Sequence, residues 1–288
     1  MGPLRIGGAG VKAKEGTLTR KSAIGIHLIL IFGALLMVGP FLWMLLTSFK
    51  TLGEATQMPP IIFPKDFQWK NYADATSTLP FFTFYWNTII TTVAKVLGQM
   101  ILCSIAAYAF ARIDFPGRNV LFVFCLSVLM VPSQVYLLPQ FLLIRDLGWL
   151  NSLEALIVPG LFSAFGTFLL RQFFLTLPKE LEESAKLDGC NHIQIYFHIM
   201  LPLIKPGLIA LAIFTALWSW NDLMWPLIVN SSPEKMTLSA GLASLQGQNM
   251  THYPILMAGA LLAILPMIVL FMFLQKQFVE GISLTGSK

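Results

Sequence analysis

The residues best suited to bind a solute gather near position 220, in an otherwise apolar stretch. Trp218, Trp220, Asn221, Asp222 and Trp225 follow one another closely there. Aromatic faces pack on the C–H surfaces of sugars, while amide and carboxylate groups pair with sugar hydroxyls. The composition therefore suits carbohydrate binding. Helix packing explains the same residues equally well, and interfacial anchoring explains Trp225.

A second polar pair lies in another apolar stretch, where Lys95 and Gln99 stand one helical turn apart on one face. A lysine in such a stretch lines a water-filled path, pairs with a carboxylate, or extends its alkyl stem toward water. The sequence leaves all three readings open. The candidates for a solute path are Lys95, Gln99, Trp218, Trp220, Asn221 and Asp222.

The sequence contains no arrangement typical of a catalytic centre. The four histidines lie on different segments, without metal-ligand spacing and without a nucleophile motif. The three cysteines make an odd count without motif spacing, which implies no disulfide framework. The glycine-rich opening Gly7–Gly10 lacks the spacing of a phosphate-binding loop. We therefore predict a non-catalytic chain that binds no metal or cofactor and does not hydrolyse ATP itself.

Charge, glycine and proline gather in one further stretch, at 178–206, between two apolar runs. Three glutamates follow Pro178 and suit the first turns of a helix, because carboxylates stabilise its positive end. Gly189 stands where a C-terminal cap would end that helix, and Asn191 can cap the next one. The pattern predicts a short exposed helix, a glycine corner, and a return helix over His192–Met200 that ends by Pro202.

Long apolar segments carry these residues. The chain has 288 residues, of which 56% are hydrophobic and 11% are charged, whereas a soluble domain carries about 25% charged residues. Six runs are long enough to cross a hydrocarbon core of ~30 Å as helices. They cover 22–49, 84–111, 119–143, 153–175, 206–229 and 254–274. The predicted fold is all-α, a polytopic membrane protein with six transmembrane helices.

The distribution of positive charge predicts the orientation of these spans. Lysine and arginine are more frequent on the side of the N-terminus than in the alternate loops, which places that side in the cytoplasm. We predict a cytoplasmic tail at 1–22, a six-helix domain at 23–275 that includes the polar loop 178–206, and a second cytoplasmic tail at 276–288. The expected location is a bacterial or archaeal plasma (inner) membrane.

The polar loop resembles the EAA loop of binding-protein-dependent ATP-binding-cassette importer permeases. That loop reads Glu-Ala-Ala, a glycine four residues on, and then Ile-x-Leu-Pro. Here it reads Glu183-Ser184-Ala185, Gly189 and Ile199–Pro202, with serine for one alanine. Further motifs along nearly the whole chain are similar to the carbohydrate branch, and more narrowly to the second permease subunit of maltose-type importers. They are Pro40–Lys50, Asn71-Tyr72, Trp86–Thr88, Ala106–Arg112, Phe115–Gly117, Trp220-Asn221 and Trp225-Pro226.

The resemblance implies a permease subunit that takes up an oligosaccharide, or a related polyol or glycerol phosphate, delivered by an extracellular binding protein. It also implies a second, homologous permease and two ATPase subunits, which hold the ATP and Mg. The short helix before Gly189 is then a coupling helix that docks on an ATPase. The residues that the resemblance assigns to this coupling are Glu182, Glu183, Ser184, Ala185, Leu187, Asp188, Gly189 and Pro202.

Two other classes of protein are weighed against this reading. A self-contained secondary transporter predicts ion-coupling carboxylates near the midplane and broken-helix repeats. Asp222 alone gives thin support for it, and no repeat is visible. A membrane-embedded enzyme is disfavoured by the missing catalytic motifs. In the importer reading the loops 50–83 and 230–253 face outward and meet the binding protein.

Overall fold

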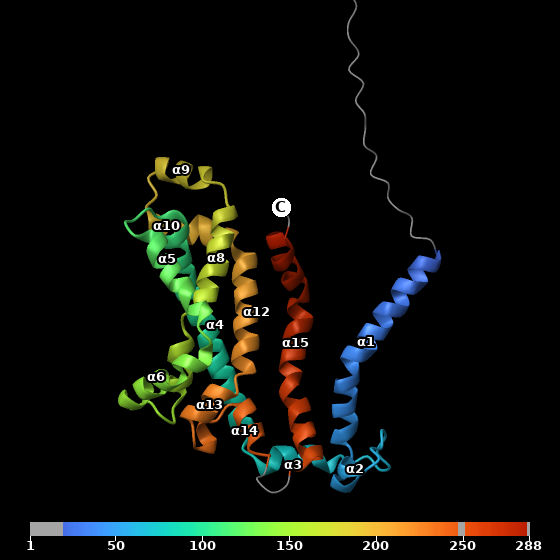
Figure 1. Ribbon diagram of the computed structural model, residues 1–288. Coiled ribbons are helices and arrows are strands. Elements are labelled where there is room, and N and C mark those ends of the chain that lie inside the picture. Colours follow the sequence, from blue (N-terminus) through green and yellow to red (C-terminus); the bar gives the residue numbers. More distant parts are fainter. Residues whose placement is uncertain (1–19, 247–250, 287–288) are drawn as a thin grey trace, which may run out of the picture.

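The structure is a computed structural model that describes residues 20–246 and 251–286. These residues form helices joined by loops, and their only strand-like pairing is an isolated bridge between Gln246 and Thr251. Four segments are long and apolar enough to cross a membrane, and two bent helix pairs raise the number to six if each pair is one span. The predicted all-α membrane fold is confirmed (Figure 1).

The four single spans form the long axis of the molecule. The third of them contains a short helix, a 3-10 turn and a longer helix in succession. The spans are α1 (Arg20–Ser48), α4 (Phe81–Arg112), the segment Leu153–Thr176 with α7 (Leu153–Ile157) and α8 (Ala164–Thr176), and α15 (Tyr253–Gly286).

The first bent pair replaces the third predicted span, 119–143, with two helices at 101° to each other. These are α5 (Arg118–Ser127), extended by a 3-10 turn to Met130, and α6 (Ser133–Asp146). The bend follows from Pro132, because proline has no amide hydrogen and excludes the preceding residue from helical geometry. Val131 and Pro132 are both extended, with ψ of 122° and 135°.

The second bent pair joins the segment His192–Leu203 to α12 (Lys205–Trp220) at 75°. The helix of the fifth predicted span, 206–229, ends at Trp220, and α13 (Met224–Val229) begins after a break. The last helix is longer than predicted. It continues to Gly286, through most of the predicted tail 276–288.

The centre of the bundle is formed by α4, α8 and α12, which pack closely on one another. Gly207 on α12 permits this approach, because a Cβ there would lie 2.6 Å from the ring of Phe173 on α8. The apolar core at this level includes Leu170 and Leu211, both fully buried. A close-packed interior of this kind transmits displacement from one helix to the next.

The end of the molecule that carries α2 (Leu52–Thr56) and α3 (Lys70–Thr78) is held by hydrogen bonds. Asn71 donates to the carbonyls of Ser48 and Lys50 at 2.8 and 2.9 Å. Lys50 in turn donates to the Ile61 carbonyl at 2.7 Å and lies over the Trp43 ring. Burial lowers the pKa of the Lys50 ammonium. These contacts fix the end of α1 to the loop that follows it.

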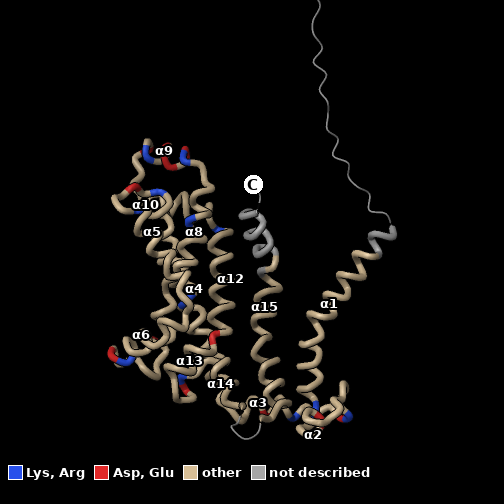
Figure 2. Tube along the Cα trace, viewed as in Figure 1, with Lys and Arg blue, Asp and Glu red and all other residues tan. Residues whose placement is uncertain are grey.

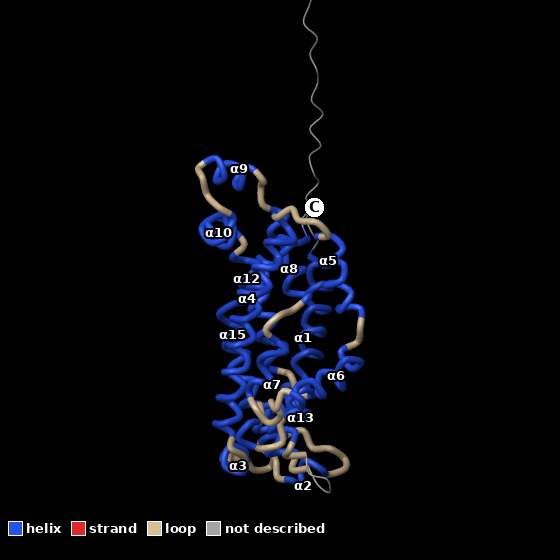
Figure 3. Tube along the Cα trace, turned by 90° about the vertical axis from the view of Figure 1, so that its left-hand side faces the viewer, coloured by secondary structure: helices blue, strands red, loops and turns tan. Residues whose placement is uncertain are grey.

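The opposite end carries a separate helix, α9 (Glu180–Leu187), which lies across the bundle axis beyond α5 and α8. Two views at right angles agree on this position (Figures 1 and 3). The start of α1 and the end of α15 lie at the same end of the molecule as α9 (Figure 1). Most of α1 is exposed and packs chiefly against α15.

Candidate functional site

The sequence of α9 favours a short helix, because its acidic residues lie near the N-terminus and a basic residue lies near the C-terminus. Glu180, Glu182 and Glu183 occupy the first turn, and Lys186 lies in the last turn. Carboxylates near the N-terminus and a cation near the C-terminus offset the partial charges of the unpaired backbone groups there. Figure 2 shows this concentration of charge at the end of a largely uncharged bundle. The predicted short helix is confirmed.

Gly189 makes the predicted corner after α9. Its φ is +82°, a left-handed conformation that glycine adopts without a Cβ clash. The Gly189 amide donates to the Lys186 carbonyl at 3.0 Å, and the Cys190 amide donates to the Ala185 carbonyl at 2.9 Å. These two bonds form a Schellman motif, which satisfies the last carbonyls of the helix. The chain therefore turns sharply and returns toward the bundle.

The return helix begins at Asn191, as predicted. Asn191 and Gln194 exchange side-chain and backbone hydrogen bonds at 2.9 Å in a capping box. After α10 (His192–Ile195), residues Tyr196–Met200 adopt a π-helix, which the sequence did not predict. The helix also runs past Pro202 to Leu203, because Pro202 occupies the first turn of the last short helix, α11 (Leu201–Leu203), where proline is tolerated.

The eight residues assigned to coupling divide between two faces. Glu182 and Ala185 are only 7% and 5% exposed and point into this chain's own bundle. Leu187, the last residue of α9, is 90% exposed. The other exposed members of the set are Glu183, Ser184, Asp188 and Gly189, and Pro202 lies in the return helix.

An arginine absent from the predicted site anchors the inner face of α9. The side chain of Arg112, the last residue of α4, donates to the carbonyls of Phe174 and Leu177, the latter at 2.5 Å. Its Nε lies 3.8 Å from Oε1 of Glu182. The sequence signal was present, since Arg112 belongs to the motif Ala106–Arg112. Its partner Glu182 is 70 residues away in the chain, so the sequence alone did not predict the pair.

Two of the predicted path residues meet nearer the other end of the molecule. Lys95 on α4 pairs with Asp222 at 3.7 Å, as one of the three readings of this lysine expects. Gln99 donates to the Gly160 carbonyl at 2.9 Å and accepts from the Thr215 hydroxyl at 2.7 Å. Gln99 therefore joins α4 to two neighbouring elements within the protein.

The Lys95–Asp222 pair lines a pocket of about 320 Å³ between α4, α6 and the segment that follows α12. The polar lining from α6 was not predicted, because the bend at Pro132 is needed to turn that helix toward the pair. The pocket also includes Trp225, whose indole donates to the Ala155 carbonyl at 2.9 Å. The further polar lining residues are Ser133, Gln134, Tyr136 and Gln140.

The remaining path candidates lie elsewhere. Trp220 is buried, with its indole nitrogen donating to the Ala263 carbonyl at 3.1 Å. Trp218 is exposed and packs against Phe165 and Phe214. Asn221, with Trp220, lines a separate pocket of about 380 Å³ between α1, α12 and α15. None of these three side chains lines the pocket at the Lys95–Asp222 pair, although Asn221 precedes Asp222 in the chain.

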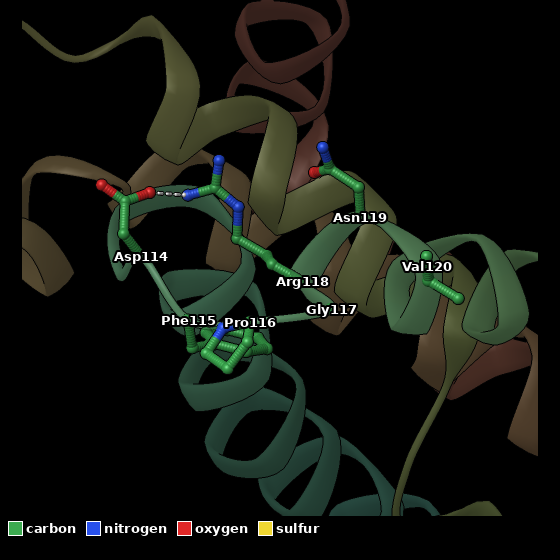
Figure 4. A pocket seen from close by; sticks show the side chains of 7 residues that line it. All are labelled: Asp114, Phe115, Pro116, Gly117, Arg118, Asn119 and Val120. Atoms are coloured by element: carbon green, nitrogen blue, oxygen red, sulfur yellow. Dashed lines mark hydrogen bonds and ion pairs between the residues drawn. The ribbon is translucent and has the colours of Figure 1, made fainter.

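A shallow hollow also lies on the α4–α5 connection (Figure 4). Its lining is the loop itself, where Asp114 and Arg118 form an exposed ion pair at 2.6 Å. Gly117 in this loop has a φ of +80° with open space around it, as Gly189 does. The hollow contains one ion pair on the surface and no convergent set of polar groups, so it does not form a binding site for the predicted solute.

A bundle of spans with a helix set across one end, and a pocket within the spans, defines a polytopic membrane transport protein. The fold is similar to the crystal structure of a bacterial ABC transporter involved in the import of the acidic polysaccharide alginate. The TM-score is 0.78 at 26% identity, over 90% of this chain and 97% of that one.

Residues 99–284 match the family described as binding-protein-dependent transport system inner membrane component. The arabinooligosaccharides transport system permease protein of Halalkalibacterium halodurans is 36% identical over 260 residues, 89% of this chain and 93% of that relative. The sn-glycerol-3-phosphate transport system permease protein of Pectobacterium atrosepticum is 33% identical over 264 residues, 89% and 94%. The chain belongs to this family and is an ABC importer permease, a reading favoured over a self-contained secondary transporter.

Proposed function

We propose that this permease imports carbohydrate, with energy supplied by separate ATPase subunits that dock on α9. The expected assembly contains a second permease, two ATPase subunits and an extracellular binding protein. The chain's relatives support a sugar or a related phosphate ester, since two of them are named for arabinooligosaccharides and sn-glycerol-3-phosphate. The proposed location of α9 and both termini is the cytoplasmic side of the inner membrane.

The exposed face of α9 is the observation that carries the coupling proposal. Leu187 is 90% exposed beside the charged groups of Glu183 and Asp188. Protein interfaces combine apolar side chains with polar groups at their rim, and the exposed Leu187 beside Glu183 fits this composition. In the proposed docking, Leu187 fills an apolar cleft of the ATPase, and Glu183 makes a polar contact at its rim.

The pocket at Lys95 and Asp222 is proposed as part of the solute path. The ammonium and the carboxylate offer a donor and an acceptor to hydroxyl groups, and the α6 side chains add further hydrogen-bonding groups. Burying a charged pair inside a membrane bundle costs free energy, so such pairs usually face water and mark a functional path. An alternating-access cycle would open this pocket to each side in turn.

Replacement of the glycine corner tests the coupling. In the reconstituted importer, Gly189→Asp forces a Cβ onto a backbone with φ of +82°, which strains the turn by roughly 1–2 kcal/mol. We expect solute uptake and the ATP hydrolysis stimulated by loaded binding protein to fall together. Gly117→Asp is the matched control, because it carries the same strain at φ of +80° on the neighbouring α4–α5 loop.

The two variants give a clear decision. Loss of stimulated hydrolysis in Gly189→Asp, with retention in Gly117→Asp, supports α9 as the coupling element. Normal uptake and stimulation in Gly189→Asp contradict the assignment. Equal loss in both variants indicates that strain at this end of the molecule damages the fold in general, and it also counts against a specific function of α9.

A further inference from the structure

The inner face of α9 is attached to the bundle through one charged side chain. Arg112 ends α4, and its guanidinium donates to two carbonyls at the end of α8, those of Phe174 and Leu177. Its Nε faces Glu182 Oε1 of α9 at 3.8 Å. One side chain therefore contacts three elements: the helix that carries it, the end of α8, and the transverse helix α9.

Burial makes this contact an obligatory one. The side chains of Arg112 and Glu182 are only 4% and 10% exposed. Within the described part of the chain, neither Arg112 Nε nor Glu182 Oε1 has a hydrogen-bond partner. The Glu182 charge is therefore compensated chiefly by Arg112, and separation would leave a buried carboxylate unpaired. The pair opposes any movement of α9 away from α4.

The length of the pair also permits limited movement. A hydrogen bond is lost within a few tenths of an ångström beyond its normal length, whereas the attraction between charges decreases only as the reciprocal of distance. At 3.8 Å the Arg112–Glu182 contact is held by charge, not by a directed hydrogen bond. Small rotations of α9 keep the pair intact, and larger ones pull on Arg112 and on the α8 carbonyls.

Apolar contacts beside the pair extend the attachment. Ala185, which lies one turn after Glu182 on the same face of α9, is in one buried cluster with Tyr108 of α4 and Phe174 of α8. Tyr196 of the π-helix completes that cluster, with its ring 5.3 Å from the ring of Tyr108. The elements on both sides of the glycine corner thus pack on the same part of α4.

We propose that Arg112 is a positioning residue that transmits movement of α9 into α4 and α8, with Glu182 as its contact on α9. The proposal rests on the proposed coupling function of α9. It gives two adjacent glutamates different roles, since Glu183 faces the ATPase and Glu182 faces the bundle. It also links α9 to the solute path, because α4 carries Lys95 about 25 Å from Arg112, at 1.5 Å per helical residue.

The test compares Glu182→Gln with Glu183→Gln in the complete importer reconstituted in nanodiscs and vesicles. Each change removes one carboxylate and leaves a side chain of nearly the same shape, and the two positions are adjacent in the chain. For Glu182→Gln we expect the solute imported per ATP hydrolysed to fall about tenfold, and backbone hydrogen exchange of Glu180–Leu187 to accelerate, while the ATPase subunits still co-purify. For Glu183→Gln we expect weaker binding of the ATPase subunits and no acceleration of that exchange in the permease.

Two further variants guard against a merely structural explanation. Asp114→Asn breaks the exposed Arg118–Asp114 pair at the same end of the molecule and should change neither readout. Glu182→Asp retains the charge on a shorter stem and should recover part of the lost import per ATP. A simple folding defect would lower the yield of complex without changing the solute-to-ATP ratio of the molecules that remain.

The outcomes separate this inference from the proposed function. A normal solute-to-ATP ratio and normal exchange of α9 in Glu182→Gln overturn the inference and leave the coupling function of α9 in place. Weakened ATPase binding in Glu182→Gln, equal to that in Glu183→Gln, also overturns it, because Glu182 would then act at the ATPase surface. Failure of Gly189→Asp to affect coupling would remove the proposed function itself.

Discussion

Two partly or fully buried ion pairs involve α4, one near its middle and one at its last residue, and their separations are nearly the same. Arg112 and Glu182 lie 3.8 Å apart, and Lys95 and Asp222 lie 3.7 Å apart. Their surroundings differ. The side chains of the first pair are 4% and 10% exposed and Arg112 also binds two carbonyls, whereas those of the second are 11% and 28% exposed and line a pocket.

The difference shows how one kind of contact can have two uses. A charged pair enclosed by protein cannot exchange its partner for water, so it holds its elements in position. A charged pair beside a pocket can exchange its partner for water or for a solute hydroxyl, at a smaller loss of free energy. We therefore expect substitutions at Arg112 to affect stability and coupling, and substitutions at Lys95 and Asp222 to affect import.

The largest effect is expected for Arg112→Met. This change leaves the Glu182 carboxylate buried and removes the donor for the Phe174 and Leu177 carbonyls. Loss of one partner of a buried pair lowers the free energy of unfolding by about 3–5 kcal/mol. Thermal unfolding of the purified complex measures it. The double variant Arg112→Met/Glu182→Leu should recover part of the lost stability. If Arg112→Met unfolds at the wild-type temperature, the enclosed pair does not hold its elements in position and the contrast with the Lys95–Asp222 pair is wrong.

A second substitution examines the pair beside the pocket. Asp222→Asn leaves Lys95 without its carboxylate, but water in the pocket can solvate the ammonium. We expect a smaller loss of stability than in Arg112→Met, because the Asp222 side chain is 28% exposed, and a decrease in solute uptake of about tenfold or more. Asp146→Asn, which breaks the exposed Arg145–Asp146 pair, serves as control. A loss of stability as large as that of Arg112→Met would show that the two pairs do not differ.

A smaller effect is expected at Gly160, which contacts the same lysine. A Cβ at this position would lie 2.7 Å from Cε of Lys95 and would displace the side chain from Asp222. Gly160→Ala should therefore reduce uptake several-fold with little change in unfolding temperature. Gly53→Ala provides the comparison, since a Cβ there has open space. Identical uptake by both variants would mean that the position of Lys95 does not matter for import.

The smallest effect concerns a carboxylate outside both pairs. Glu54 accepts hydrogen bonds from the Thr51 and Lys65 amides, and the Thr51 bond is the main cause of its lowered pKa. A depressed pKa stabilises the folded state above the ordinary value of 4.5, and this contribution is lost as pH falls through the folded pKa. The protection factors of the Leu52–Thr56 amides, which are corrected for the pH dependence of intrinsic exchange, should fall on acidification in the wild type. Glu54→Gln should abolish that pH dependence, and an unchanged dependence would exclude Glu54 as its source.

Local features of the fold could be predicted from sequence, because they depend on residues near one another in the chain. Gly189 and Asn191 predicted the corner and the second cap of the polar loop, and both predictions are confirmed. The bend at Pro132 was missed, although its cause is local, because the apolar run continues across the proline. The π-helix at Tyr196–Met200 has no sequence signal of this kind.

The site could be predicted only in part, because its contacts join distant segments. Asp222 was one of the possible partners of Lys95, but the α6 side chains reach the pocket only through the bend. Arg112 was noted in the sequence only as the end of the motif Ala106–Arg112, since its partner Glu182 lies on a different element. The two faces of α9 also required the structure, because an eight-residue helix with charges at half of its positions gives little indication of which face is buried.

The packing of α1 has a consequence for biosynthesis. Within this chain α1 packs mainly against α15, which is far from it in sequence, and almost none of its hydrocarbon-facing surface is covered. An emerging chain inserts α1 well before α15 and must keep it in lipid until α15 has been translated. The contact between these two helices therefore forms late, and a ribosome that stops before Tyr253 releases a protein in which α1 lacks its main partner.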